Sequence, residues 1–235
     1  MQTLKNEILT IQVSEHGAEL QSIRKDDYEY LWQGNPEYWG RRSPVLFPIV
    51  GSVWEKCFRV DGKVYEMGQH GFARDMDFEL VSASETELWY KLESDENTLK
   101  AYPWPFVLEI GYKLAGDSVE VLWKVTNPGD KDMYFQIGAH PAFNYPGYDP
   151  ETVDRGYVAF DKTEGLQRIG FKGKGCVDPA SVCPLTLGED GLLPIMSDTF
   201  DPIDTIMLQD DQVHRVAFFK PDHSPYLTLT FDAPV

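Results

Sequence analysis

The chain has 235 residues, a length at which an all-β sandwich is commonly one domain. Hydrophobic residues make up 42% of it and charged residues 25%, which excludes a disordered chain, a collagen-like repeat and a coiled coil. The 38 Asp and Glu outnumber the 21 Lys and Arg and give a net charge of −17, so we expect neither nucleic acid nor a membrane as a partner. We therefore expect a folded, soluble protein with a single domain over residues 1–235.

The cysteines and the N-terminal segment indicate the cytoplasm. Cys57, Cys176 and Cys183 are odd in number and lack C-x-x-C spacing, which favours neither a disulfide framework nor a zinc ribbon. Residues 1–9 carry polar and charged side chains where a signal peptide needs a continuous apolar core. The longest apolar run, residues 44–54, contains two prolines and a glycine and is too short to span a membrane.

Alternating apolar residues predict short strands joined by tight turns. In residues 60–64 an Asp-Gly pair, which tolerates positive φ at both central positions of a turn, separates two strand-like runs. Residues 88–92 alternate again. Residues 106–114 and 119–125 alternate on either side of Gly116-Asp117, which predicts a β-hairpin.

The second half of the chain is less regular. Residues 213–231 predict two more strands around a turn at 221–225, whereas residues 145–184 show little periodicity and are expected to form long loops with short strands. The 19 Gly and 16 Pro are spread between the runs rather than gathered in a linker. This pattern predicts an all-β fold, an antiparallel sandwich or barrel, without an internal domain boundary.

Two of the five histidines lie in unusual local sequences. His70 is followed by Gly71, and His140 follows Gly138-Ala139 and precedes Pro141. Glycine removes side chains that would crowd a ligand, and proline biases the preceding residue toward extended backbone. Because histidine suits proton transfer near neutral pH, we predict that His70 and His140 are catalytic. The other three histidines are interpreted as structural or surface residues.

Two rival chemistries have weaker support. Two histidines and a carboxylate can hold iron or zinc, but the chain has no H-x-H or H-E-x-x-H pair, so we expect no metal. A serine hydrolase is disfavoured because no G-x-S-x-G motif is present.

Basic residues gather between positions 41 and 74. This segment has a local charge of +3 in a chain of net charge −17. Arg42 and Arg74 adjoin Pro- and Gly-rich or histidine-bearing motifs, so we expect both to contact a ligand. The guanidinium group suits sugar hydroxyls, carboxylates and phosphates, which leaves the charge of that ligand open.

Several motifs together resemble the aldose 1-epimerase, or galactose mutarotase-like, family and its LacX-like branch. The resemblance extends from about residue 7 to the end of the chain. It is carried by Arg41-Arg-Ser-Pro-Val-Leu-Phe-Pro-Ile-Val-Gly51, Gln69-His-Gly-Phe-Ala-Arg74 and Gly138-Ala-His-Pro-Ala-Phe-Asn144, with weaker matches at 14–23, 29–34 and 200–206.

The resemblance implies an antiparallel β-supersandwich and interconversion of the α and β anomers of an aldose without cofactor or metal. In that family the residue matching His140 acts as general acid on the ring oxygen, and the one matching His70 hydrogen-bonds the sugar nearby. Residues matching Arg42 and Asp204 hold sugar hydroxyls. We also expect Gln69 and Phe143, which lie in the matching motifs, to bind the substrate.

One departure concerns the general base. The family uses a glutamate on a C-terminal strand in a Glu-Pro-Trp-like context, and this sequence reaches Val235 before any such motif. We expect a C-terminal truncation, with the base beyond residue 235. The substrate is expected to be a hexose or a hexose phosphate. The competing hypothesis is a carbohydrate-binding or sensing protein without turnover, with Trp39 and Phe143 near the sugar.

Overall fold

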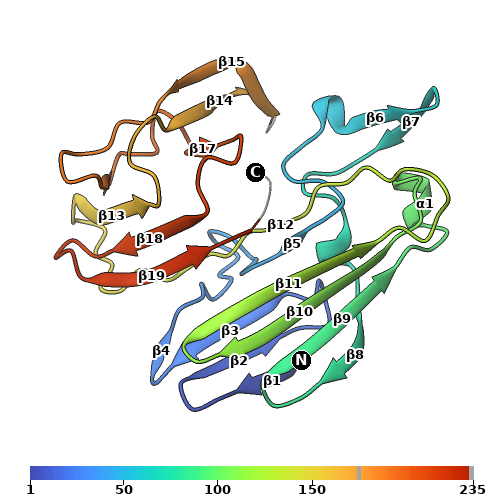
Figure 1. The fold of residues 1–235 in the computed structure, drawn as a ribbon, viewed down its shortest axis with the longest axis horizontal. Helices are drawn as coiled ribbons and strands as arrows, with labels where there is room; N and C mark the ends of the chain where they lie inside the picture. The colour runs from blue at the N-terminus through green and yellow to red at the C-terminus, as the bar shows by residue number, and fades with distance from the viewer. Residues whose placement is uncertain (174–175, 233–235) are drawn as a thin grey trace. The chain divides into compact units, whose positions relative to one another are not determined.

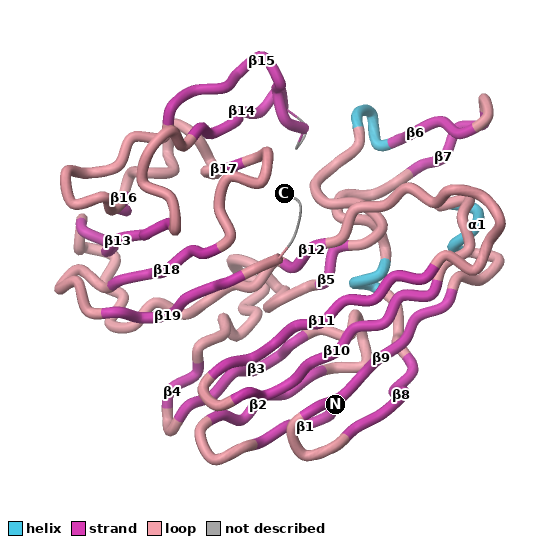
Figure 2. Tube along the Cα trace, in the orientation of Figure 1, coloured by secondary structure: helices cyan, strands magenta, loops and turns pink. Residues whose placement is uncertain are grey.

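A computed structural model describes residues 1–173 and 176–232, and the chain forms two compact units, Met1–Tyr145 and Pro146–Val235. Strands dominate both units, and the few helical turns are short (Figures 1 and 2). The predicted all-β antiparallel fold is therefore confirmed. The expectation of one domain over residues 1–235 stays a prediction.

The first unit is built mainly from two four-stranded sheets of consecutive strands. Their orders are β1-β2-β3-β4 and β11-β10-β9-β8. The strands of the first unit are β1 (Gln2–Lys5), β2 (Leu9–Val13), β3 (Leu20–Lys25), β4 (Tyr28–Glu29), β5 (Val45–Leu46), β6 (Cys57–Val60), β7 (Lys63–Glu66), β8 (Glu79–Ala83), β9 (Glu87–Glu93), β10 (Val107–Ala115), β11 (Ser118–Thr126) and β12 (Gly138–Ala139). The helical turns are η1 (Trp54–Lys56), η2 (Ala73–Asp75) and α1 (Thr98–Ala101).

The core of the first unit lies between these two sheets. Every second residue of β9 is buried, and one cluster joins Ile11 and Val13 of β2 with Leu88 of β9 and Ile110 of β10. Burial of each such side chain stabilises the fold by about 1.5–3 kcal/mol. The Tyr112 hydroxyl, also buried, donates a hydrogen bond to the backbone oxygen of Ala18 at 2.7 Å. The alternation in the sequence thus corresponds to one face packed on the core.

The two tight turns predicted from the sequence are confirmed. Val60 pairs with Lys63 across Asp61 and Gly62, whose φ angles are 50° and 77°. Two central residues with positive φ match the right-handed twist of the strands on either side. Likewise, Ala115 of β10 pairs with Ser118 of β11 around Gly116-Asp117.

The second unit contains two further antiparallel sheets. Their orders are β16-β13-β18-β19 and β15-β14-β17. The strands are β13 (Asp154–Phe160), β14 (Gln167–Gly173), β15 (Cys176–Pro184), β16 (Leu193–Met196), β17 (Met207–Leu208), β18 (Arg215–Phe219) and β19 (Pro225–Thr230). The strand pair predicted in 213–231 is confirmed, because β18 and β19 are antiparallel neighbours.

The prediction of long loops with short strands in 145–184 is wrong for most of that segment. After a loop, the chain forms β13, β14 and β15, of seven, seven and nine residues. In β15 most side chains are exposed, and its pairing with β14 contains register shifts. A strand without a regularly buried face has no apolar alternation, so the sequence pattern does not reveal it.

Candidate active site

His140 lies at the end of a short strand in the first unit. Gly138 and Ala139 form β12, which pairs antiparallel with β5, and the His140 amide donates to the Pro44 carbonyl at 3.1 Å. A Cβ atom at Gly138 would lie 3.1 Å from a methyl carbon of Val50, so this approach is tight for any larger residue. The Gly-Ala-His-Pro motif therefore fixes His140 through its backbone.

His70 is held by a reciprocal exchange with Gly51. The His70 amide donates to the Gly51 carbonyl at 2.7 Å, and the Gly51 amide donates to Nδ1 of His70 at 3.0 Å. His70 has a φ of 63°, an uncommon conformation for a residue with a side chain. Because Nδ1 accepts a hydrogen bond, the neutral ring carries its proton on Nε2.

The next residue, Gly71, explains part of this geometry. Its φ is 70°, and a Cβ atom there would lie 2.1 Å from the Phe47 carbonyl oxygen. That oxygen accepts the amides of Phe72 and Ala73. Only glycine combines this φ with so close a backbone approach.

The structure brings the two predicted catalytic histidines together. Their ring centroids are 6.0 Å apart, and the ring of Trp39 lies 5.0 Å from that of His140. The side chain of His70 is half-buried and His140 is exposed. Burial lowers the pKa of His70 to about 4, with a further contribution from the positive charges of Arg74, His140 and Arg41. The imidazole of His70 is therefore neutral near neutral pH.

Arg42 is anchored beside the same segment. Its Nη1 donates to the backbone oxygen of Gln21 at 2.7 Å, and its own carbonyl accepts the amide of Ala142 at 2.8 Å. Phe143, one residue further, is half-buried against the core and forms a β-bridge with Leu31. Arg42 is thus connected by the backbone to the His140 motif, and the part of Phe143 in substrate binding stays a prediction.

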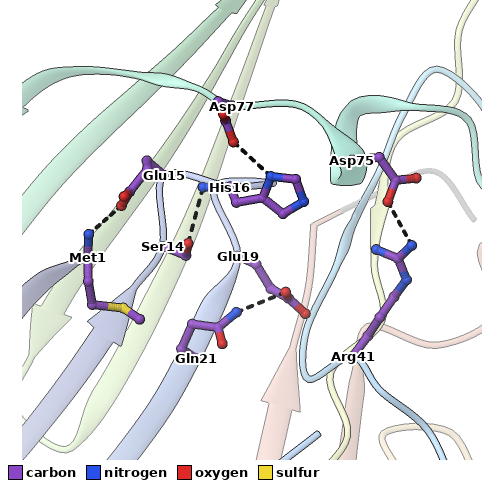
Figure 3. A network of polar contacts seen from close by, with 9 residues as sticks. All are labelled: Met1, Ser14, Glu15, His16, Glu19, Gln21, Arg41, Asp75 and Asp77. Carbon is purple, nitrogen blue, oxygen red and sulfur yellow. Dashed lines mark hydrogen bonds and ion pairs between the residues drawn. The ribbon is translucent and has the colours of Figure 1, made fainter. Parts of the chain in front are cut away.

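Arg74 and Gln69 form a second group near His70. Nη2 of Arg74 donates to the Gln69 carbonyl at 2.7 Å, and the Gln69 side chain is exposed. Nε of Arg74 is buried and makes no hydrogen bond within the described residues, and the Asp75 carboxylate lies 3.8 Å from it. Arg41 also pairs with Asp75, at 2.8 Å (Figure 3). Burial, followed by the charge of Arg41, lowers the pKa of Arg74.

Asp204 lies in the second unit. It has a φ of 59°, and its amide donates to the Phe200 carbonyl at 2.7 Å. Its neighbours Thr205 and Ile206 line an apolar cavity of about 380 Å³ in that unit, together with Phe160. The part of Asp204 in sugar binding stays a prediction.

Two residues that contact the site were not identified from the sequence. Gly51 orients the His70 ring, and Glu19 binds the backbone at Arg42 and Ser43. Gly51 ends the motif that begins at Arg41, but nothing in that motif indicates its hydrogen bond to His70. Glu19 lies in the segment 14–23, but nothing local indicated a partner more than twenty residues away.

Within residues 1–173 and 176–232, no group of three or more His, Cys, Asp or Glu side chains is arranged to hold a metal ion. In the same residues no helix has the length and apolar character that a membrane crossing requires.

The sequence matches a known protein family over most of its length. The sequence model of the family described as aldose 1-epimerase matches residues 1–169. The chain belongs to the aldose 1-epimerase family. The resemblance seen in the motifs is therefore confirmed.

A curated relative of this chain supports the same family. Protein LacX (chromosomal) of Lactococcus lactis subsp. lactis is 38% identical over 169 residues, which cover 68% of this chain and 56% of that protein. The match with this curated relative therefore spans about half of its length.

Solved structures of family relatives have the same fold. A galactose mutarotase related enzyme from Lactobacillus acidophilus superposes with a TM-score of 0.86 at 33% identity, covering 94% of this chain and 73% of the other. A galactose mutarotase-like protein from Lactobacillus casei ATCC 334 gives a TM-score of 0.85 at 31% identity, covering 95% and 76%. These similarities support the fold class expected from the sequence.

Proposed function

We propose that this protein is a mutarotase, an isomerase that interconverts the α and β anomers of a hexose. The observation that carries the proposal is the pair of imidazole rings 6.0 Å apart, of which His70 has its neutral tautomer fixed by Gly51 and His140 is exposed. Membership of the aldose 1-epimerase family supports it, as do the names of the galactose mutarotase-like relatives.

The chemistry needs two proton transfers. The ring opens when a proton reaches the ring oxygen O5 while the hydroxyl at O1 loses one, and rotation about C1–C2 followed by closure gives the other anomer. We assign the proton donor for O5 to His140, whose exposed ring is accessible to a sugar. The proton on O1 goes to a carboxylate base, which we do not assign to a residue of this chain.

His70 and the arginines bind the substrate in this proposal. With Nδ1 occupied by the Gly51 amide, Nε2–H of His70 is directed to a sugar oxygen as a donor. Arg42 contributes the guanidinium N–H groups that Gln21 does not use. Arg74, Gln69 and Phe143 complete the proposed set of substrate-binding residues in the first unit.

Polarimetry tests the proposal directly. Freshly dissolved α-galactose and α-glucose are followed with wild-type protein, His140→Gln and His70→Gln, and with His214→Gln as a control in the second unit. Loss of a general acid should lower kcat about 100-fold or more in His140→Gln, while the control keeps wild-type rates. Equal rates for His140→Gln and wild type would contradict the assignment of the acid.

Hexose phosphates and simple binding are the remaining outcomes. Anomer exchange in hexose phosphate alone, measured by NMR exchange spectroscopy, would identify a phosphorylated substrate, which the basic residues between Arg41 and Arg74 could hold. Sugar binding by calorimetry without anomer exchange in any of these sugars would replace the mutarotase with a carbohydrate-binding protein.

A further inference from the structure

Glu19 connects the strand β3 to the arginine of the candidate site. It lies directly before β3, and its Oε1 accepts the backbone amides of both Arg42 and Ser43 at 2.9 Å. Its Oε2 accepts Nε2 of Gln21 at 2.8 Å (Figure 3). The half-buried Glu19 carboxylate therefore accepts three hydrogen bonds, which replace contacts with water that it loses on burial.

Gln21 completes the connection from its backbone. Its carbonyl oxygen accepts Nη1 of Arg42 at 2.7 Å. Glu19 thus binds the main chain of Arg42, and the adjacent strand binds its guanidinium. On the other side of the arginine, a Cβ atom at Gly34 would lie 3.2 Å from Nε and 3.3 Å from Cγ of Arg42. The Arg42 side chain therefore passes close to Gly34, and its guanidinium group is held by the hydrogen bond to Gln21.

The same segment leads to His140. The Arg42 carbonyl accepts the Ala142 amide at 2.8 Å, and the Pro44 carbonyl accepts the His140 amide at 3.1 Å. A shift of the backbone at residues 42–43 would therefore reach the strand that presents His140. Positioning of this kind affects binding because small displacements of a substrate-contacting group are costly.

From these contacts we propose that Glu19 is a positioning residue: through its carboxylate, and with Gln21, it orients Arg42 toward the sugar hydroxyls. The inference rests on the mutarotase function proposed above. It assigns Glu19 no contact with substrate and no proton transfer, because its two oxygens are already used by Arg42, Ser43 and Gln21.

Three variants separate positioning from simple stabilisation. Glu19→Ala removes the acceptor and should raise KM about tenfold, with a smaller effect on kcat, because Arg42 loses its orientation. Glu19→Gln keeps a carbonyl oxygen for the two amides and should stay within about threefold of wild-type KM. Tyr112→Phe is the matched control, since it removes a buried hydrogen bond to the adjacent residue Ala18 and should lower stability without changing KM.

The outcomes decide between the two roles. An unchanged KM in Glu19→Ala would overturn the proposal, and so would a KM that rises equally in Tyr112→Phe. If Glu19→Ala does not fold, Gln21→Leu decides. A raised KM in Gln21→Leu, together with a wild-type KM in Glu19→Gln, supports the proposal. A wild-type KM in Gln21→Leu overturns it.

Failure of the proposed function is seen separately. A wild-type protein without mutarotation contradicts that function, and positioning is then measured by NMR as the solvent exchange of the Arg42 guanidinium protons. Exchange should be faster in Glu19→Ala than in wild type, Glu19→Gln and Tyr112→Phe. Equal exchange in all four proteins would overturn the positioning role whatever the activity.

Discussion

Nδ1 of His70 accepts the backbone N–H of Gly51, while the Gly51 carbonyl accepts the backbone N–H of His70. Protonation of Nδ1 would replace this acceptor with a second donor facing an amide, so the pair favours the neutral ring. Burial and the charges of Arg74, His140 and Arg41 act in the same direction. The His70 ring is therefore built to donate one hydrogen bond at neutral pH.

The first prediction concerns stability against pH. The folded pKa of His70 is about 4 and the ordinary value is 6.5, so between these values the unfolded chain binds a proton that the folded chain does not. This contribution is fully present above pH 6.5 and is lost as the pH falls toward 4. Urea unfolding from pH 4 to 7.5 should show a steeper loss for wild type than for His70→Gln.

The control for that experiment is a variant that changes no titratable side chain. Gly62→Ala should retain the pH dependence of wild type in the urea series. If His70→Gln and wild type lose stability in parallel, the low pKa of His70 is wrong.

The second prediction concerns the approach of Gly71 to Phe47. Gly71→Ala introduces a Cβ atom 2.1 Å from a backbone oxygen, at a φ of 70°, and should cost about 3 kcal/mol or more in the free energy of unfolding. Gly62→Ala is the matched control, because its φ is 77° but nothing lies within 4 Å of the new atom. It should cost only about 1 kcal/mol in the same urea titration. Similar losses in both variants would show that the close approach is not important.

The third prediction concerns the hydrogen bond between Tyr112 and Ala18. Tyr112→Phe leaves a buried carbonyl without its donor and should lower the free energy of unfolding by about 1–2 kcal/mol. Tyr38, which is 75% exposed, provides the comparison. Tyr38→Phe should change the midpoint of thermal unfolding little.

The fourth prediction concerns Trp39, whose ring lies 5.0 Å from that of His140. An aromatic face at this position suits the C–H surface of a pyranose, so Trp39→Ala should weaken sugar binding about tenfold in calorimetry. Trp39→Phe retains an aromatic ring and should lose less. Unchanged binding in Trp39→Ala would assign Trp39 to the support of His140 alone.

Local sequence was enough to predict some of these features. The turns at Asp61-Gly62 and Gly116-Asp117 were predictable because two-residue hairpins depend on the residues within them. His70 and His140 stand out in the sequence because Gly71, Gly138 and Pro141 lie beside them, and their catalytic roles stay a prediction.

Features that depend on distant residues could not be predicted in the same way. Glu19 binds amides 23 and 24 positions away, and a glutamate before a strand has no pattern of its own. The strands β14 and β15 were missed because exposed residues carry no alternation. Sequence patterns report burial and turns, whereas long-range hydrogen bonds require the fold.

Residues 44–51 contact both histidine motifs through main-chain groups. The Pro44 carbonyl binds the His140 amide, the Phe47 carbonyl binds those of Phe72 and Ala73, and Gly51 binds His70. The two imidazoles are therefore held by contacts with the same eight residues, although they lie seventy positions apart along the chain. The sheet of β8 to β11 lies within that interval, so the spacing of the imidazoles follows from main-chain contacts with residues 44–51 rather than from the length of chain between the histidines.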